Sequence, residues 1–285
     1  MAARPATLPA ALAGVVVGIG AALGAGYALR IDTALGCVAV ALLLQVVANF
    51  ANDLSDFRKG ADTPDRFGPL RVAAAGLVTE RQLEIAIAIV ILAAGLVGLW
   101  LAAVGGPVLI GLGALAIVAA LAYTGGPWPY GYKALGEVFV FIFFGLVAVV
   151  GSAYLQAGRL EPVFWVAALP VGALVTAILV VNNLRDIPTD RAAGKRTLAV
   201  VLGVRPTQAE YVLLVVVAAL VPVVLVAAQW PAWVLLPLLS LPLAVPLVRT
   251  VRGFTEPRQL NPVLKGTARL ALVYSVLFAI GLAAS

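Results

Sequence analysis

Long apolar stretches separated by short polar segments dominate the chain. A helix needs roughly 20 apolar residues to cross the hydrocarbon core of a bilayer, so each uncharged stretch of that length predicts one membrane span. Two stretches are long enough for two spans each, because breaks fall at Gly105-Gly106-Pro107 and near Gln229-Trp230-Pro231. The pattern predicts an all-α polytopic membrane protein with nine transmembrane helices in one domain, residues 1–285. The stretches are 5–29, 33–52, 85–132, 138–158, 162–184, 211–248 and 266–284.

Basic residues support the count of nine spans. With nine spans, 17 of the 19 lysines and arginines lie on one side and only Arg30 and Arg159 on the other. If 211–248 were one span, the split would be 12 to 7. Because Lys and Arg gather in cytoplasmic loops, we expect a multi-pass cell (inner) membrane protein with a cytoplasmic N-terminus. The net charge of +6 then follows from topology, and no nucleic-acid partner is expected.

Composition narrows the chemistry that this membrane protein can perform. The chain is 63% hydrophobic and 11% charged, with one cysteine, Cys37, and no histidine. Without imidazole, the chain can have no His-ligated zinc, no proximal-His haem and no Ser-His-Asp or Cys-His triad. Glycines inside the spans, such as Gly18, Gly24, Gly111 and Gly113, indicate close helix packing. The chemistry must come from carboxylates, amides, Lys, Arg, Tyr or a bound cofactor.

Nineteen of the 32 charged residues lie in two windows, 49–84 and 185–210. Each window begins at the predicted cytoplasmic end of a span, the second and the sixth. Polar residues recur there every three or four positions, which places them on one helix face if the helices continue. They are Asn49, Asn52, Asp53 and Asp56 in the first window, and Asn182 or Asn183, Asp186 and Asp190 in the second.

Paired carboxylates at a membrane interface repel each other, which favours a bound cation. Mg²⁺ takes oxygen ligands, often one or two carboxylates plus substrate phosphates. Two such sites facing each other could hold a diphosphate between two metals. Helix caps and solvated loop charges are the alternative explanation. The matching composition and sidedness of the two windows favour the metal site.

The two windows resemble the motifs of the UbiA superfamily of intramembrane aromatic prenyltransferases. Asn52-Asp53-Leu-Ser-Asp56 is similar to its first motif, and Asp186, Asp190, Gly194 and Thr197 match its second. In the first motif the family's third Asp is replaced by Gly60, with Asp62 displaced by two positions. The resemblance implies the family's nine-helix bundle, with active-site loops at about 52–81, 124–133 and 184–208.

Further strings resemble the branch that prenylates 1,4-dihydroxy-2-naphthoate for menaquinone. They are Asn49-Phe-Ala-Asn-Asp, Gly68-Pro-Leu-Arg71, Tyr123-Thr-Gly-Gly-Pro-Trp-Pro-Tyr130-Gly-Tyr-Lys133, Asn182-Asn-Leu-Arg-Asp186 and Gly194-Lys-Arg-Thr-Leu-Ala199. This resemblance implies transfer of a polyprenyl group from its diphosphate to the naphthoate, with loss of diphosphate and CO₂, giving demethylmenaquinol. An allylic cation forms when diphosphate leaves, and Mg²⁺ is the implied cofactor.

The resemblance also assigns roles to individual residues. Metal and diphosphate are expected at Asn52, Asp53, Asp56, Asp186 and Asp190, directly or through water, with Asn182 and Asn183 as second choices. Candidates for the diphosphate oxygens are Arg66, Arg71, Arg191, Lys195 and Arg196, each of which is also explained as a topology signal. Lys133 is expected to meet the acceptor carboxylate or the diphosphate. Tyr123 and Tyr130 are expected at the substrate, with a membrane-interface role as the alternative for such tyrosines.

Two other functions remain open from the sequence. One is a secondary transporter or channel, although such proteins usually place charges near the bilayer midplane. The other is prenyl transfer to a different acceptor, namely 4-hydroxybenzoate, homogentisate or a tetrapyrrole. Prenyl chain length is not readable, because the depth of a tail groove depends on helix packing.

Overall fold

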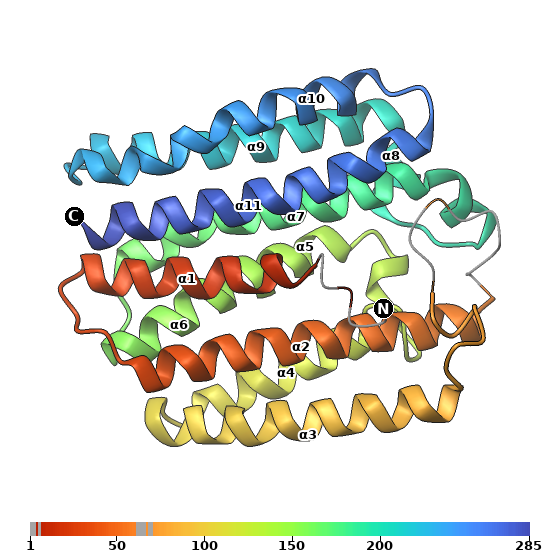
Figure 1. Cartoon of the computed structure of the whole chain (residues 1–285), viewed down its shortest axis with the longest axis horizontal. Coiled ribbons are helices and arrows are strands. Elements are labelled where there is room, and N and C mark those ends of the chain that lie inside the picture. The colour runs from red at the N-terminus through yellow and green to blue at the C-terminus, as the bar shows by residue number, and fades with distance from the viewer. Residues whose placement is uncertain (1–3, 5–6, 61–66, 68–70) are drawn as a thin grey trace.

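The computed structural model describes residue 4, residues 7–60, residue 67 and residues 71–285. Apart from one isolated β-bridge, their regular structure is helical. The longer helices lie side by side along one axis (Figure 1). The elements are α1 (Leu8–Gly24), α2 (Ile31–Arg58), α3 (Glu80–Gly105), α4 (Val108–Ala122), η2 (Tyr130–Tyr132), α5 (Gly136–Val140), η3 (Phe141–Val147), α6 (Ala148–Ala157), α7 (Pro162–Ala192), α8 (Leu198–Leu202), α9 (Val204–Ala227), η4 (Ala232–Leu243), α10 (Ala244–Gly253), η5 (Pro257–Gln259) and α11 (Leu260–Ala283).

Each stretch predicted to span the membrane contains a helix, and both predicted breaks are present. Gly106, with φ +98°, separates α3 from α4, and α9 ends at Ala227 before η4 begins. Seven of the described helical segments are long and apolar enough to cross a membrane. The other two are shorter apolar helices: α1 has 17 residues and α4 has 15. At 1.5 Å per residue, α4 is about 22 Å long, less than a core of about 30 Å. The all-α membrane class is confirmed, and the count of nine spans stays a prediction.

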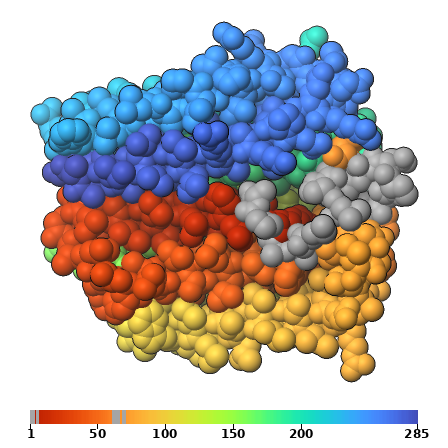
Figure 2. Space-filling view, viewed as in Figure 1, coloured from red at the N-terminus to blue at the C-terminus, as the bar shows by residue number. Residues whose placement is uncertain are grey.

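Helix α1 lies at the centre of the bundle and packs against its neighbours through glycines. Figure 2 shows it between α11 and α2 on one face. A Cβ atom at Gly18 would lie 2.1 Å from Ser152 Oγ and 2.3 Å from the carbonyl oxygen of Val149, both on α6. At Gly24 it would lie 2.1 Å from the carbonyl oxygen of Leu282 on α11. The expectation of close packing is confirmed here, since backbones approach this closely only without side chains.

Gly111 and Gly113 do not fit that expectation. A Cβ atom at either position meets no neighbouring heavy atom within 4 Å. Their helix, α4, has only one buried residue, Ala119. Close packing between helices is therefore the wrong explanation for these two glycines.

Replacing Gly18 with valine is expected to destabilise the bundle, because α6 and α1 would have to move apart. Overpacking of a tight contact costs about 1–3 kcal/mol. Gly111→Val is the matched control, since its side chain would enter open space. Thermal unfolding in detergent should show a clear loss for Gly18→Val only. Equal melting temperatures for the two variants would contradict the packing described above.

The two helices that carry the acidic motifs end in the same way. Helices α2 and α7 both continue through their acidic motifs, as the expected placement of the polar residues on one helix face requires. Gly60 has φ +63° and Gly194 has φ +71°, each four residues after the last Asp of its motif. A left-handed glycine just beyond the last turn is a common helix terminator. The glycine that replaces the family's third Asp thus has the same role as its counterpart after α7.

Candidate active site

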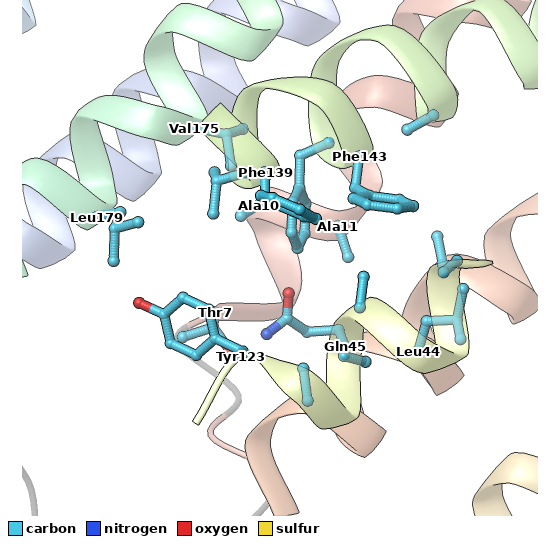
Figure 3. Close-up of a pocket in the computed structure, with 18 of the residues that line it drawn as sticks. Thr7, Ala10, Ala11, Leu44, Gln45, Tyr123, Phe139, Phe143, Val175 and Leu179 are labelled. Carbon is cyan, nitrogen blue, oxygen red and sulfur yellow. The ribbon is translucent and has the colours of Figure 1, made fainter. Parts of the chain in front are cut away.

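A cavity of about 430 Å³ opens between α2, α4, α7 and the η3–α6 segment. Polar side chains line it where α2 and α7 end, and apolar side chains line the rest. On α2 the lining residues run from Asp56 back to Cys37, about 28 Å at 1.5 Å per residue. Figure 3 shows Phe139 and Phe143 on one side of the cavity, with Gln45 and Tyr123 side by side across from them. The cavity joins a charged end to a long apolar end.

Asp56 is the centre of the charged end. It is 1% exposed and accepts hydrogen bonds from three side chains. The Tyr132 hydroxyl lies 2.7 Å and the Lys195 ammonium 3.0 Å from Oδ1, and Arg71 Nη2 lies 2.8 Å from Oδ2. These partners come from three segments far apart in sequence. Asp56 holds two cationic side chains beside the cavity, and these leave an excess of positive charge there. Such an excess favours an anionic ligand.

The other polar groups of α2 serve different contacts. Asp53, three residues before Asp56, does not line the cavity. Its Oδ2 accepts a hydrogen bond from the backbone N–H of Val72 at 3.1 Å, and Arg71 Nε lies 3.9 Å from its Oδ1. Asn52 does line the cavity and accepts a hydrogen bond from Thr124 at 3.0 Å. Asp53 thus fixes the segment that brings Arg71 to Asp56.

On α7, Asp186 forms a buried ion pair with its neighbour in sequence. Arg185 donates from Nε and Nη2 to the two carboxylate oxygens, at 2.7 and 2.6 Å. The same guanidinium donates to Asn182 at 2.9 Å and to Asn261 of α11 at 3.0 Å, and it is 2% exposed. Asn261 in turn donates to the carbonyl oxygen of Phe67 at 3.1 Å. Arg185 therefore connects the second motif to α11 and to the loop that follows the first motif.

The loop that follows α4 and the loop that follows α7 meet next to Asp56. The backbone N–H of Arg196 donates to the carbonyl oxygen of Tyr132 at 3.2 Å, and Lys133 and Arg196 form the isolated β-bridge. Lys59 and Lys195 place their ammonium groups 4.6 and 4.8 Å from the Tyr132 ring centroid. Burial, and to a smaller extent the nearby Lys195, lower the pKa of Lys59. The Tyr132 ring thus holds two cations at the site, an arrangement stabilised by the ring quadrupole.

Aromatic side chains line the cavity between its charged end and its apolar end. The Tyr123 and Tyr130 rings meet edge to face at 5.4 Å, and Tyr130 stacks on Phe139 at 4.0 Å. Tyr130 donates its hydroxyl to the carbonyl oxygen of Ala119 at 2.9 Å. A tyrosine phenol ordinarily titrates at about pH 10, so both tyrosine side chains are neutral at neutral pH. Neutral aromatic faces next to the charged end can stabilise a carbocation.

The structure brings most of the expected residues to this cavity. Those that line it are Asn52, Asp56, Arg71, Tyr123, Tyr130, Asn182, Asn183, Asp186, Asp190 and Lys195. Arg191 and Arg196 are exposed and do not line it. Lys133 is also exposed, with its ammonium 5.7 Å from the Trp128 ring centroid, and it lines a separate pocket with Arg196. Arg66 and Asp62 lie outside the described residues.

Sequence reasoning missed Tyr132, Lys59 and Arg185. Tyr132 belongs to the aromatic run before Lys133, and its position in that run was the available signal. Adjacent residues on a helix point about 100° apart, so spacing alone does not pair Arg185 with Asp186. A buried side chain as long as Arg can fold back and make that contact.

The donor set of the cavity fits Mg²⁺. Three carboxylates (Asp56, Asp186, Asp190) and three amides (Asn52, Asn182, Asn183) supply oxygen atoms to its lining. In the part of the chain that the structure describes, no three acidic or cysteine side chains gather into a closed metal cage. Mg²⁺ does not need such a cage, since it binds through one or two carboxylates and completes its shell with water and substrate phosphates.

Comparisons with known proteins agree with this geometry. Residues 11–273 match the UbiA prenyltransferase family. The chain is 44% identical to 1,4-dihydroxy-2-naphthoate octaprenyltransferase of Mycobacterium tuberculosis, covering 99% of this chain and 95% of the relative. It is 40% identical to the Escherichia coli protein of the same name, covering 98% and 92%.

Solved structures share the fold. The apo UbiA homolog of Aeropyrum pernix aligns with a TM-score of 0.70 at 18% identity, covering 95% of this chain and 96% of the other. The Archaeoglobus fulgidus homolog bound to DMAPP and Mg²⁺ aligns with a TM-score of 0.63 at 15% identity, covering 98% of each chain. At these identities the likeness concerns the helical arrangement only.

Proposed function

Because this chain belongs to the UbiA prenyltransferase family, we propose that it transfers a polyprenyl group from a polyprenyl diphosphate to 1,4-dihydroxy-2-naphthoate in menaquinone biosynthesis. The observation that carries the proposal is one cavity with a charged end and a long apolar end. A polyprenyl diphosphate has the same division, with an anionic head and an apolar tail. The names of the relatives that are 40–44% identical over nearly the whole chain support the aromatic acceptor and an octaprenyl donor.

The residues at the charged end have roles in binding the head group. Arg71 and Lys195 donate to diphosphate oxygens, since both already face Asp56 beside the cavity. Asp56, Asp186 and Asp190 would hold Mg²⁺ with the amides of Asn52 and Asn182. When bound, Mg²⁺ neutralises charge on the departing diphosphate. Asp53 acts through Arg71, which it positions by holding the Val72 backbone.

The reaction breaks the C–O bond to diphosphate and the C–C bond to the carboxylate, and it forms one new C–C bond. The bond between the allylic carbon and the diphosphate oxygen breaks, and the electron pair leaves with diphosphate. The ring carbon that carries the naphthoate carboxylate then attacks the allylic cation. Loss of CO₂ returns an electron pair to the ring and restores aromaticity. The walls formed by Tyr123, Tyr130 and Phe139 exclude water, which would otherwise quench the cation.

We place the protein in the cell (inner) membrane as a multi-pass protein, with the charged end on the cytoplasmic side. Both acidic motifs and the basic loops lie at the same end of the bundle, and the C-terminus lies at the other (Figure 1). This is the sidedness that the positive-inside rule favours. The acceptor would reach the site from the cytoplasm and the donor tail from the lipid.

Prenyl transfer by the purified protein tests the proposal. We expect octaprenyl diphosphate and 1,4-dihydroxy-2-naphthoate to give one prenylated, decarboxylated product in Mg²⁺ and none in EDTA. Parallel reactions with 4-hydroxybenzoate and homogentisate test the acceptor. Product formation only with one of these would overturn the naphthoate assignment. Full activity in EDTA would exclude the metal, and no product with any acceptor would exclude prenyl transfer.

A further inference from the structure

Three glycines line the apolar end of the cavity, each on a different helix. They are Gly98 on α3, Gly113 on α4 and Gly151 on α6. A Cβ atom at any of them would meet no neighbouring heavy atom within 4 Å. By contrast, a Cβ atom at Gly18 or Gly145 would collide with the helix next to it. The first three glycines therefore border empty space instead of a packed neighbour.

All three lie far from the charged end. Helix α3 begins at that end of the bundle, and Gly98 follows its first residue, Glu80, by 18 positions, about 27 Å. Helix α4 begins at the opposite end, and Gly113 is only five residues after its start at Val108. Gly151 lies near the end of the α5–η3–α6 segment, which runs from Gly136 to Ala157. A side chain added at these positions would change the far part of the cavity and leave the acidic motifs untouched.

Glycine is a poor choice for a helix interior unless something requires it. It is less favourable there than alanine by roughly 0.5–1 kcal/mol. In membrane helices the usual compensation is close packing against another helix, and none of these three positions has it. What they do share is a wall of the cavity. At a position in the cavity wall, leaving out a side chain makes room for a ligand.

We propose that Gly98, Gly113 and Gly151 determine the length of the prenyl tail that the enzyme accepts. This inference rests on the proposed function, because it assigns the far end of the same cavity to the distal isoprene units. Absent side chains keep that part of the cavity wide enough for a long tail. A bulky side chain at any of the three would close it to long tails while short tails still fit.

Leucine substitutions combined with donors of graded length test the proposal. In the full-length protein we expect Gly98→Leu, Gly113→Leu and Gly151→Leu each to lower kcat/KM for octaprenyl diphosphate by about tenfold or more. For geranyl diphosphate, whose tail does not reach these positions, we expect rates within about twofold of wild type.

Two further glycines provide matched controls. Gly95 on α3 and Gly111 on α4 also have open surroundings, but they do not line the cavity. Gly95→Leu and Gly111→Leu should therefore leave both donors unaffected. An equal loss with geranyl and octaprenyl donors, or the same loss in the control variants, would show a structural effect and overturn the proposal. Unchanged use of the octaprenyl donor by all three variants would also overturn it.

The chain's single cysteine gives a readout that does not depend on catalysis. Cys37 lines the far part of the cavity and is buried. Without acceptor, octaprenyl diphosphate should slow alkylation of Cys37 by N-ethylmaleimide, and geranyl diphosphate should not. Gly113→Leu should weaken the protection by the octaprenyl donor.

Outcomes of the two measurements separate this inference from the proposed function. If the wild type transfers octaprenyl groups but Cys37 is not protected, the assignment of the tail to this end is wrong and the function stands. If no donor is transferred to any acceptor, the function itself is wrong. In that case a length-dependent protection of Cys37 would still report a channel for prenyl tails.

Discussion

Replacing Asp56 with asparagine is expected to lower prenyl transfer by roughly 100- to 1,000-fold, the range seen when one electrostatic contact to a transition state is removed. The carboxylate is the counter-charge for both Arg71 and Lys195 and an expected Mg²⁺ ligand. Asparagine keeps an oxygen that can accept the Tyr132 hydroxyl but removes the negative charge. The measurement is the initial rate with saturating donor, acceptor and Mg²⁺.

Asp32→Asn is the matched control for this variant. Asp32 is exposed in the first turn of the same helix, at the opposite end of the bundle from the site. Its loss removes only a favourable charge at a helix N-terminus, about 0.3–1 kcal/mol. A wild-type rate for Asp56→Asn, in protein that elutes as a single folded species, would refute the assignment of Asp56 to the reaction.

Replacing Arg185 with methionine is expected to have the largest effect on stability. The change leaves the Asp186 carboxylate buried without its cation, and breaking a buried pair in this way costs about 3–5 kcal/mol. It also removes the hydrogen bond from Arg185 to Asn261, whose amide donates to the Phe67 carbonyl oxygen. Thermal unfolding in detergent should show the loss, and prenyl transfer should fall with it.

A double variant separates the two effects of Arg185. Arg185→Met combined with Asp186→Asn removes both charges, so no unpaired buried charge remains. We expect much of the thermal stability to return, because replacing both members of a buried pair is often close to neutral. Activity should stay low, since Asp186 lines the cavity as an expected metal ligand. If Arg185→Met melts like the wild type, the pair does not hold the second motif in place.

The sequence predicted many of the side chains that line the charged end of the cavity, for a physical reason. Carboxylates and amides spaced by three and four residues share a helix face, and only the continuation of α2 and α7 was needed to bring them to the cavity. Asp53 shows the limit of this argument. Asp53 has the same spacing of three and four residues, yet it does not line the cavity. Its carboxylate accepts a hydrogen bond from the Val72 backbone instead. Spacing fixes a direction around the helix axis, but contacts across the bundle fix the partner.

The partners of these residues could not be predicted, because they come from distant segments. Asp56 on α2 meets Tyr132 and Lys195 only after two loops pair below it. Arg185 reaches Asn261, 76 positions later in the chain. Lys133 is the opposite case, a residue that the sequence predicted at the site and that does not line the cavity. The prediction rested on its isolated charge in an aromatic loop. The structure instead places it at the surface over Trp128.

The pattern along the chain by itself determined that this is an all-helical membrane protein with its chemistry at one end. Helix length, the charge bias of the loops and the spacing of carboxylates are local properties, and each is fixed by the chain before it folds. The depth and shape of the cavity were decided only by tertiary packing. Gly18 and Gly113 are the same residue in similarly apolar helices. Only the neighbouring helices make one a packing contact and the other an opening for a ligand.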